Sequence, residues 1–337
     1  MDKLIKPQRL HPGDTVATLS ISGGRAGDPD MIGRYRVGQR RLEEIFGLRV
    51  VETPHSLAGN EFIYRNPKAR VDDLHEALLN PEIKGIITNM GGDDSYRLLP
   101  YIDYDIIRNN PKVMIGFSDI SSLHNMFTHA GVSSFYGPSL LTPIAQPVRL
   151  DAYTEKWMRK ALFCAEPMGE IEPCEKWTSI EWYKSKEEEI LWQENTGYEI
   201  LQGTGTVTGR LIGGCAGPLR QMMGTPVFPT AQMWKDSIIF LECPCPYGGK
   251  SGLHELRAFA ATGMFRLAKG MICPNLNEEE KATLLKVIRE EEGLLDFPIL
   301  LNVDFGHRTP MTVLPIGALA QIDCDASKFT ILESGVE

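Results

Sequence analysis

From Thr15 to Tyr136 the chain alternates short apolar runs with segments of helical period. The apolar runs lie at 16–21, 48–52, 84–89, 113–117 and 133–136, and the helical patterns at 31–46, 69–79 and 120–127. Strands that alternate with crossover helices are typical of βαβ units and a parallel sheet. Ligands of such sheets bind outside the carboxyl ends of the strands. The pattern therefore predicts an α/β domain with a site at the edge that carries Gly91, Gly92 and Ser118.

The pattern changes between Glu166 and Asn195, where no period is sustained. This stretch holds three tryptophans and the acidic run 187–189, and we interpret it as an interdomain connection. A second domain begins near Gln202, with further strands expected at 237–241, 268–272 and 299–303 and helices at 253–261 and 278–291. We expect Gly213 and Gly214 to open another helix. The prediction is an N-terminal domain at 1–165, a connection at 166–200 and a C-terminal domain at 201–337.

Length and composition agree with a packed two-domain protein. The chain has 337 residues, of which 42% are hydrophobic and 23% charged, and a formal net charge of -9. Roughly 100–200 residues make one domain, so two are expected. A chain with a net negative charge and no basic runs lacks the positively charged surface that binds a nucleic-acid polymer, so we expect no such partner.

The lack of a signal-peptide pattern and the spacing of the cysteines predict a cytoplasmic location. The N-terminal segment lacks the apolar stretch of a signal peptide, and no apolar run is long enough to span a membrane. The seven cysteines are an odd number scattered along a long chain, which favours reduced thiols over a disulfide framework. We expect a cytoplasmic protein with no membrane partner.

Ser118 lies in the sequence Gly116-Phe-Ser-Asp119, where an apolar strand meets a helix. A serine in such a turn projects its hydroxyl from the sheet edge, as in a nucleophile elbow. The following helix N-terminus offers free N–H groups to an oxyanion. Ile120 stands where the second glycine of the usual motif would be, so the alternative remains that Ser118 only caps the helix.

The glycine pair in Asn89-Met-Gly-Gly-Asp93 follows the preceding strand. Glycines allow a close approach of the backbone, so this segment could lie beside Ser118 and supply a second oxyanion donor. The alternative is a simple tight turn.

Glu242 and His307 each stand at the end of an apolar run in the second domain. A carboxylate that ends a buried strand needs a partner, which could be a histidine or an arginine in a structural ion pair. A nucleophilic serine needs a base, and the base needs a third group that fixes its tautomer. The order Ser118, Glu242, His307 would supply all three across a cleft between the lobes, although a lone histidine in a loop can also be only a polar surface residue.

Several motifs for metals and nucleotides are incomplete. Cys243-Pro-Cys245 has no matching second pair, and His254-Glu-Leu-Arg-Ala258 lacks the second histidine of a zinc peptidase. Gly249-Lys-Ser251 lacks the first glycine of a phosphate loop, and the glycines from 203 to 209 do not have dinucleotide-binding spacing. We therefore expect no metal site.

Five motifs in one order resemble those of a known family, the serine peptidases that include the LD-carboxypeptidases and the microcin C immunity peptidases. The motifs are Met90-Gly-Gly92 before Tyr96-Arg-Leu-Leu-Pro100, Gly116-Phe-Ser-Asp-Ile-Ser121, Gly209-Arg-Leu-Ile-Gly-Gly214, Phe240-Leu-Glu242 and Gly306-His307. The resemblance runs from about Pro12 to Leu332. It implies a Rossmann-like N-terminal domain, a β-rich C-terminal domain, a catalytic triad without a cofactor, and a homodimer.

The resemblance also implies roles for individual residues. Ser118 would be the nucleophile, His307 the general base and Glu242 the group that orients the base. The amides of Gly92 and Asp119 would form the oxyanion hole.

The long connection with tryptophans resembles the immunity-type branch of the family. There, Trp177 and Trp182 would contact the substrate by stacking on the base of an aminoacyl-nucleotide, with Gly91 as a further substrate contact. Stacking tolerates any base. The alternative is that the tryptophans pack the two lobes together. Cys243-Pro-Cys-Pro246 departs from the more acidic sequence expected after Glu242, which puts contacts to the substrate's amino group in doubt.

Three functions follow as hypotheses. The first is an immunity-type peptidase that cleaves an amide or phosphoramide bond in a small peptide or aminoacyl-nucleotide. The second is an LD-carboxypeptidase that trims murein tetrapeptides during cell-wall recycling. The third, from another class, is a two-lobed protein that binds a small ligand without chemistry.

Overall fold

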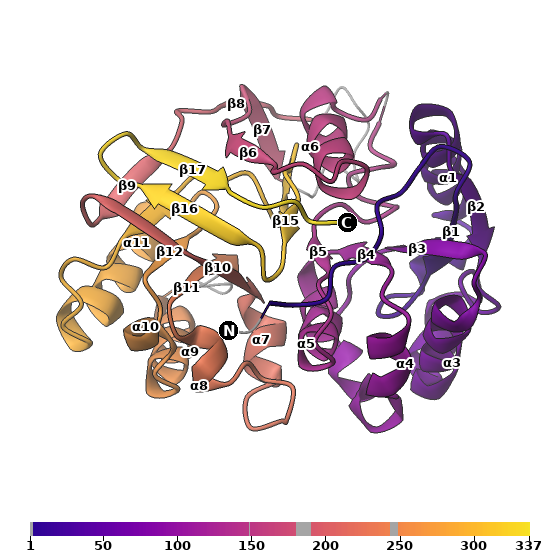
Figure 1. Ribbon diagram of the computed structural model, residues 1–337, viewed down its shortest axis with the longest axis horizontal. Helices are drawn as coiled ribbons and strands as arrows, with labels where there is room; N and C mark the ends of the chain where they lie inside the picture. Colours follow the sequence, from indigo (N-terminus) through magenta and orange to yellow (C-terminus); the bar gives the residue numbers. More distant parts are fainter. Residues whose placement is uncertain (1–2, 148, 180–189, 243–248) are drawn as a thin grey trace.

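A six-stranded sheet forms the first lobe of the computed structural model, which describes residues 3–147, 149–179, 190–242 and 249–337 (Figure 1). Its order is β15-β5-β4-β3-β1-β2, and β1 to β5 are parallel, whereas β15 joins antiparallel from the C-terminal part of the chain. The strands are β1 Thr15–Leu19, β2 Arg49–Glu52, β3 Ile83–Thr88, β4 Val113–Gly116, β5 Phe135–Tyr136 and β15 Leu314–Pro315. The predicted Rossmann-like parallel sheet is confirmed, with strand ends within two residues of those expected.

Helices cover both faces of this sheet, because every inner strand is apolar on both sides. Apolar side chains of α3, α4 and α5 pack on one face, and those of α1 and α6 pack on the other. The helices are η1 Arg25–Gly27, α1 Ile32–Phe46, α2 Asn60–Arg65, α3 Pro67–Leu79, η2 Ser95–Tyr101, α4 Tyr104–Asn109, η3 Ser118–Ile120, α5 Ser121–His129 and α6 Ala152–Leu162.

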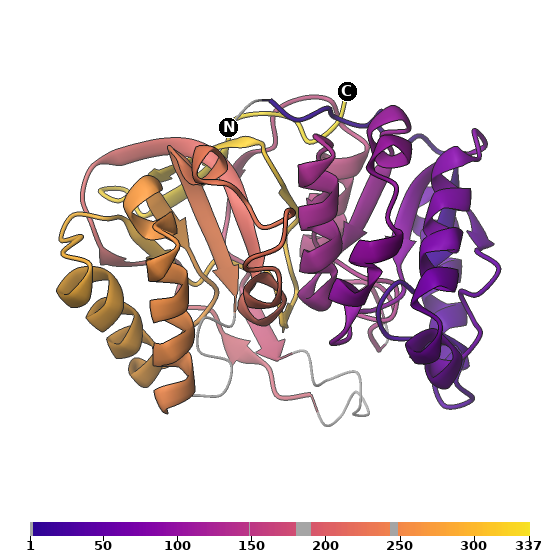
Figure 2. The ribbon, with the colours of Figure 1, turned by 90° about the horizontal axis from the view of Figure 1, so that it is seen from below.

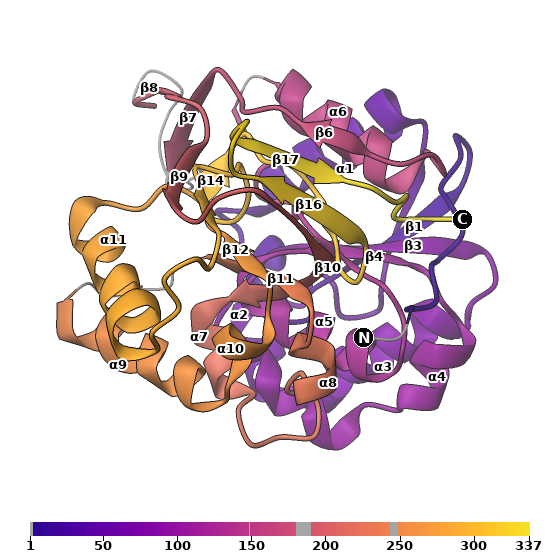
Figure 3. The ribbon, with the colours of Figure 1, turned by 60° about the vertical axis from the view of Figure 1, so that its left-hand side comes forward.

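The second lobe is built on an eight-stranded mixed sheet in the order β6-β17-β16-β10-β11-β12-β13-β9. Strands β10 to β13 are parallel, and β16, β17 and β6 continue antiparallel from β10, as Figure 3 shows for β16 and β17. The strands are β6 Gly169–Ile171, β9 Glu199–Gln202, β10 Thr206–Cys215, β11 Ser237–Glu242, β12 Gly270–Ile272, β13 Ile299–Leu301, β16 Leu319–Asp323 and β17 Lys328–Ile331. The expected β-rich α/β second domain is confirmed.

One face of this second sheet carries the helices of the lobe, and the other faces the first lobe. Ile239, Leu241 and Met271 pack with apolar residues of α9 and α11, whereas Ile238 and Phe240 belong to the core that contains the first sheet. The helices are α7 Ala216–Gln221, α8 Ala231–Trp234, α9 Gly249–Ala261, α10 Met264–Leu267, α11 Glu278–Leu285 and the π-helical η6 Lys286–Glu291. None of the described helices is long and apolar enough to cross a bilayer.

Aromatic side chains join the two lobes in a shared core. The ring of Tyr136 on β5 lies 5.3 Å from that of Phe240 on β11, and Phe305 lies 6.0 Å from Phe240. Figure 2 shows the indigo and magenta lobe lying directly beside the orange and yellow lobe. The contact is apolar and continuous, so the residues that end β4 and β11 are held in a fixed relation.

The stretch that lacked a sequence period contains short strands. In addition to β6, it forms β7 Lys176–Ser179 and β8 Gln193–Glu194, which make a small sheet with β14 Arg308–Thr309 in the order β14-β7-β8. These strands are too short to show an alternating pattern, which explains why the sequence did not reveal them.

One prediction about the second domain was wrong. Gly213 and Gly214 do not open a helix but belong to β10, and α7 begins only at Ala216. A β-carbon on Gly213 would lie 1.7 Å from the carbonyl oxygen of Phe240, so the glycine is required for close contact between neighbouring strands. The single helix expected at 278–291 continues from α11 into η6, with π-type hydrogen bonding in its second half.

Candidate active site

Ser118 lies in a sharp turn between β4 and α5. Phe117 is still extended, whereas Ser118 has a φ of +64°, a left-handed conformation that costs a non-glycine residue about 1–2 kcal/mol. The turn also needs Gly116, because a β-carbon there would lie 2.2 Å from the Thr88 hydroxyl. Neither η3 nor α5 receives a side-chain cap among the described residues, so the interpretation of Ser118 as a helix cap has no support.

Glu242 ends β11 and is fully buried, and its partner is His307 rather than an arginine. The Oε2 atom of Glu242 accepts a hydrogen bond from the His307 backbone N–H at 2.8 Å and lies 3.2 Å from His307 Nδ1. The side chain of His307 is 36% exposed, against 0% for Glu242. The imidazole therefore joins a buried carboxylate to an accessible surface.

Gly306 makes this pairing possible. It has a φ of +82°, and a β-carbon on it would lie 1.6 Å from Glu242 Oε2. Only glycine both tolerates the left-handed backbone and leaves room for the carboxylate.

Tyr136 connects the glutamate with the serine, and the sequence did not point to it. Its hydroxyl accepts a hydrogen bond from the Ser118 backbone N–H at 3.0 Å and donates one to Glu242 Oε1. Tyr136 is the register partner of Gly116, two residues before Ser118. The available signal was that β5 follows β4 in a parallel sheet, which would have placed the end of β5 beside Ser118.

The electrostatic environment keeps Glu242 ionised and Tyr136 protonated. Burial alone would raise the pKa of Glu242, but the charge of His307 and the hydrogen bonds from His307 and Tyr136 outweigh it, so that the pKa is lowered. Burial, together with the nearby Glu242 charge, raises the pKa of Tyr136 well above its usual value. An anionic carboxylate beside an imidazole stabilises the imidazolium form.

The glycine pair after β3 lies against Ser118. A β-carbon on Gly91 would be 2.9 Å from the Ser118 β-carbon and 3.4 Å from the Asp119 nitrogen, and one on Gly92 would be 2.2 Å from the Ser22 hydroxyl. Among the described residues, the backbone N–H groups of Gly92 and Asp119 donate to no protein acceptor. These two donors are therefore available near the nucleophile.

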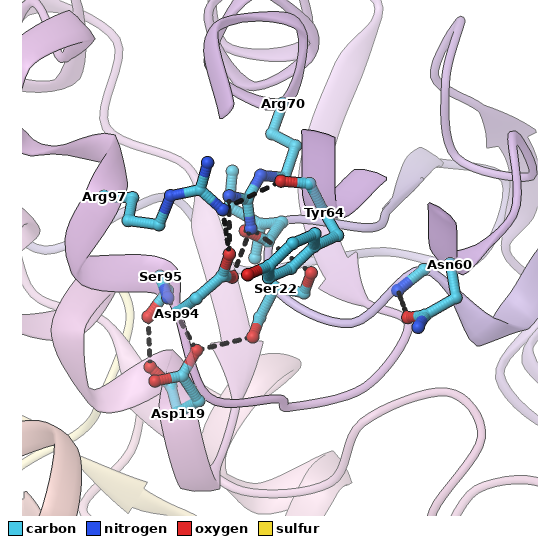
Figure 4. Close-up of polar contacts among 10 residues, drawn as sticks. Ser22, Asn60, Tyr64, Arg70, Asp94, Ser95, Arg97 and Asp119 are labelled. Atoms are coloured by element: carbon cyan, nitrogen blue, oxygen red, sulfur yellow. Dashed lines mark hydrogen bonds and ion pairs between the residues drawn. The ribbon is translucent and has the colours of Figure 1, made fainter. Parts of the chain in front are cut away.

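A buried polar network holds the backbone around Gly91, Gly92 and Asp119 in place (Figure 4). The carboxylate of Asp119 accepts hydrogen bonds from the Ser22 hydroxyl at 2.5 Å and from the Ser95 N–H at 2.8 Å, and the Ser95 hydroxyl donates to the Asp119 carbonyl at 2.6 Å. Beside it, the fully buried Arg70 pairs with Asp94 at 2.7 Å. Burial raises the pKa of Asp119.

The two tryptophans expected at the substrate differ in what can be described. Trp177 lies on β7, and the guanidinium of Arg308 sits 4.6 Å from its ring centre. Trp182 lies outside the described residues. Arg308 directly follows His307, so Trp177 packs against the segment that carries the imidazole.

A cavity of about 850 Å³ opens next to this segment. Its walls include Gln146, Tyr153, Cys174, Thr178, Trp192 and Thr309. Thr309 follows His307 by two residues. The volume lies within the range of small-molecule sites.

Among the described residues, one group of donors could hold a metal ion. Cys215, Glu242 and His307 offer donor atoms that all lie within 4.8 Å of one another. Cys215 was not singled out in the sequence, because its neighbours in space come from distant segments.

A serine in a strained strand-to-helix turn, with a carboxylate–imidazole pair from a second lobe, is the combination of groups that serine hydrolases use. The chain belongs to the LD-carboxypeptidase family. Residues 16–137 match the LD-carboxypeptidase N-terminal domain and residues 208–322 match the LD-carboxypeptidase C-terminal domain. The resemblance inferred from the sequence motifs is thereby confirmed, and the chain is an enzyme of the carboxypeptidase class.

Relatives of the chain are similar to it over most of their length. The putative carboxypeptidase YocD of Bacillus subtilis is 30% identical over 94% of this chain and 95% of its own. The microcin C7 self-immunity protein MccF of Escherichia coli is 30% identical over 82% of each chain. A crystal structure of an MccF-like protein from Streptococcus pneumoniae in complex with AMP superposes with a TM-score of 0.83, at 27% identity, over 95% of this chain and 98% of that one.

Proposed function

We propose that this protein is a serine carboxypeptidase that hydrolyses an amide bond in a small peptide or aminoacyl-nucleotide, with Ser118, His307 and Glu242 as its triad. The observation that carries the proposal is the continuous contact between the three segments. The Ser118 backbone binds the Tyr136 hydroxyl, that hydroxyl binds Glu242, and Glu242 binds His307.

In this mechanism, the Ser118 hydroxyl attacks the substrate carbonyl carbon while His307 accepts its proton. Because Nδ1 faces Glu242, Nε2 is the nitrogen that takes the proton and then returns it to the leaving amine. The backbone N–H groups of Gly92 and Asp119 stabilise the oxyanion. Water then attacks the carbonyl carbon of the acyl-enzyme while His307 accepts its proton. His307 returns that proton to the Ser118 oxygen, which releases the carboxylic acid and restores the serine.

The direct test of the triad is the variant Ser118→Ala. We expect turnover to fall by roughly 10³-fold or more while the fold is retained, because only the nucleophile is removed. A base of the histidine type also predicts that kcat/KM falls as the pH drops through about 6–7. Equal turnover in the variant would refute Ser118 as the nucleophile. A protein that binds a small ligand without chemistry would instead turn over no substrate and would not react with a fluorophosphonate.

We favour an aminoacyl-nucleotide as substrate. The likeness to an MccF-like protein in complex with AMP supports this preference, as does the long connection with tryptophans. The stacking role is assigned to Trp182. Trp177 already contacts Arg308, which supports a packing role for it.

The second candidate is a murein tetrapeptide carboxypeptidase, which the LD-carboxypeptidase match supports. Mass spectrometry of products from a panel can separate the two. The panel holds a murein tetrapeptide, an aminoacyl sulfamoyl adenosine and an ordinary L-peptide, with Ser118→Ala as the inactive control. In Trp182→Ala, we expect nucleotide turnover to fall strongly and murein turnover to change little; equal losses would contradict the nucleotide assignment.

The remaining parts of the proposal concern assembly and organisation. We infer that the protein is cytoplasmic and forms a homodimer. Light scattering of the purified protein would test the homodimer, because it gives the mass of the assembly. We also retain the division into 1–165, 166–200 and 201–337. Limited proteolysis within 166–200 that leaves two stable fragments would support that division, and cleavage elsewhere first would contradict it.

A further inference from the structure

Cys215 lies beside Glu242 on the neighbouring strand. The two residues are register partners of the parallel strands β10 and β11, so their side chains project from the same face of the sheet. Cys215 is 8% exposed and Glu242 is fully buried, whereas the third member of the cluster, His307, is partly exposed. An ion could therefore reach the cluster from the side of the imidazole.

The position of Cys215 is fixed relative to the nucleophile. Its backbone N–H donates a hydrogen bond to the Ser121 hydroxyl at 2.8 Å, and that hydroxyl donates to the Ser118 carbonyl at 2.7 Å. Cys215 is thus held across the lobe boundary by the same turn that carries Ser118.

The donor set is typical of zinc. Thiolate sulfur, imidazole nitrogen and carboxylate oxygen bind Zn²⁺ at about 2.0–2.3 Å, so two ligands of one tetrahedral ion are separated by roughly 3.3–3.6 Å. The donor atoms here lie within 4.8 Å of one another, and Glu242 Oε2 is already 3.2 Å from His307 Nδ1. A side-chain shift on the order of 1 Å would bring all three onto one ion.

We propose that Cys215, Glu242 and His307 form an inhibitory site for Zn²⁺ within the active site. Binding releases the thiol proton of Cys215 to solvent and leaves the fourth position of the ion to water. This inference rests on the proposed role of His307 as the base.

Coordination of the ion through either ring nitrogen prevents His307 from acting as the general base. If Nε2 binds the ion, its lone pair can no longer accept the serine proton. If Nδ1 binds it, the hydrogen bond to Glu242 is lost and Nε2 carries the proton instead. Both arrangements predict inhibition rather than activation.

Isothermal titration calorimetry of the reduced protein with zinc tests the site without any substrate, and we expect one ion per chain. In a separate activity assay with substrate, we expect activity to fall with the same midpoint and to return when a chelator is added. Co²⁺ used in place of Zn²⁺ should give a thiolate-to-cobalt charge-transfer absorption band. Absence of binding, or binding without the sulfur band, would overturn the proposal.

The variant Cys215→Ala identifies the ligand. We expect its zinc affinity to fall at least about tenfold, since even outer-sphere changes at metal sites cost 10–100-fold. The matched control is Cys324→Ala, whose cysteine is 7% exposed but lies outside the cluster, and it should bind zinc as the unmodified protein does. Equal affinity in both variants would refute the site. Cys215→Ser, which keeps a side chain of similar size, serves if the alanine variant does not fold.

The two proposals can fail separately. If no substrate of the panel is cleaved, calorimetry and the cobalt spectrum still decide whether the site exists. If zinc does not bind, the activity of the Ser118 and Trp182 variants still decides the proposed function.

Discussion

The hydroxyl of Tyr136 donates a hydrogen bond to the carboxylate of Glu242, and both groups are fully buried. The two residues lie on strands of different sheets, so this bond crosses the boundary between the lobes. The same hydroxyl accepts the Ser118 N–H. One side chain therefore fixes the distance between the nucleophile turn and the acidic end of β11.

Removing that hydroxyl should lower turnover without removing any reacting group. In Tyr136→Phe, the Ser118 N–H and Glu242 Oε1 lose a buried partner, which should cost about 1–3 kcal/mol of unfolding free energy. Because Ser118 and Glu242 can then shift relative to each other, we expect kcat to fall about 10- to 100-fold with little change in KM. Steady-state kinetics and urea unfolding measure the two effects.

The control for this prediction is Tyr35→Phe. Tyr35 is equally buried and its hydroxyl bonds the Thr18 hydroxyl at 2.8 Å, away from the candidate site. We expect a similar loss of stability with unchanged kcat. If Tyr136→Phe kept full activity, the tyrosine would be only a packing residue.

A methyl group at position 306 should disrupt the carboxylate–imidazole pair. In Gly306→Ala, the new β-carbon would overlap Glu242 Oε2 at 1.6 Å, in addition to the strain of a left-handed alanine. We expect activity to fall more than about 100-fold because Glu242 must move. Gly293→Ala is the matched control. It has a φ of +70° and nothing within 4 Å of its β-carbon, so it should lose only about 1–2 kcal/mol of stability and keep its activity. Similar activities in the two variants would contradict the explanation.

The Asp119 side chain should act on catalysis through the position of its own backbone. Asp119→Ala removes the acceptor of the Ser22 hydroxyl and the Ser95 N–H and leaves only the bond from the Ser95 hydroxyl to the Asp119 carbonyl, so that the backbone beside Gly91 and Gly92 is held less firmly. We expect kcat to fall about 10- to 100-fold. Asp119→Asn keeps one oxygen acceptor and should retain most of the activity.

Two outcomes decide this prediction. Ser133→Ala, which removes a buried hydroxyl bonded to the Ile316 carbonyl and not to a residue of the candidate site, should leave kcat unchanged. If Asp119→Asn were as inactive as Asp119→Ala, the negative charge of Asp119, and not its acceptor geometry, would be what catalysis requires.

Acid should destabilise the protein through His124. This histidine is fully buried between the Gly116 carbonyl and the Ser134 hydroxyl, and burial lowers its pKa from 6.5 to about 4. Below pH 6.5 the unfolded chain binds a proton that the folded chain does not bind until about pH 4. Stability therefore falls as the pH drops through this window, by on the order of 3 kcal/mol.

Urea unfolding at several pH values between 7.5 and 4.5 measures this effect. In His124→Gln, the part of the pH dependence due to His124 should disappear, whereas His11→Gln, which changes an exposed histidine, should leave it in place. An unchanged pH dependence in His124→Gln would refute the assignment. The comparison also shows whether activity lost below pH 7 reflects titration of the base or loss of the fold.

The sequence predicted the first lobe well because its information is local. The spacing of apolar residues placed β1, β3, β4 and the helices between them, and the Gly-x-Ser turn after β4 indicated Ser118. The small sheet of β7, β8 and β14 was not predicted, because strands of two to four residues do not show a period.

The sequence by itself determined the α/β class, the strand that presents Ser118, and the membership of the LD-carboxypeptidase family, since periodicity and ordered motifs lie along the chain. Only the tertiary structure decided that Glu242 pairs with His307, that Tyr136 links this pair to Ser118, and that Cys215 stands beside it. The hydrogen bond between Tyr136 and Glu242 joins residues that lie 106 positions apart in the chain. Such contacts depend on how two sheets pack through a shared apolar core, and packing between lobes leaves no periodic pattern in the chain.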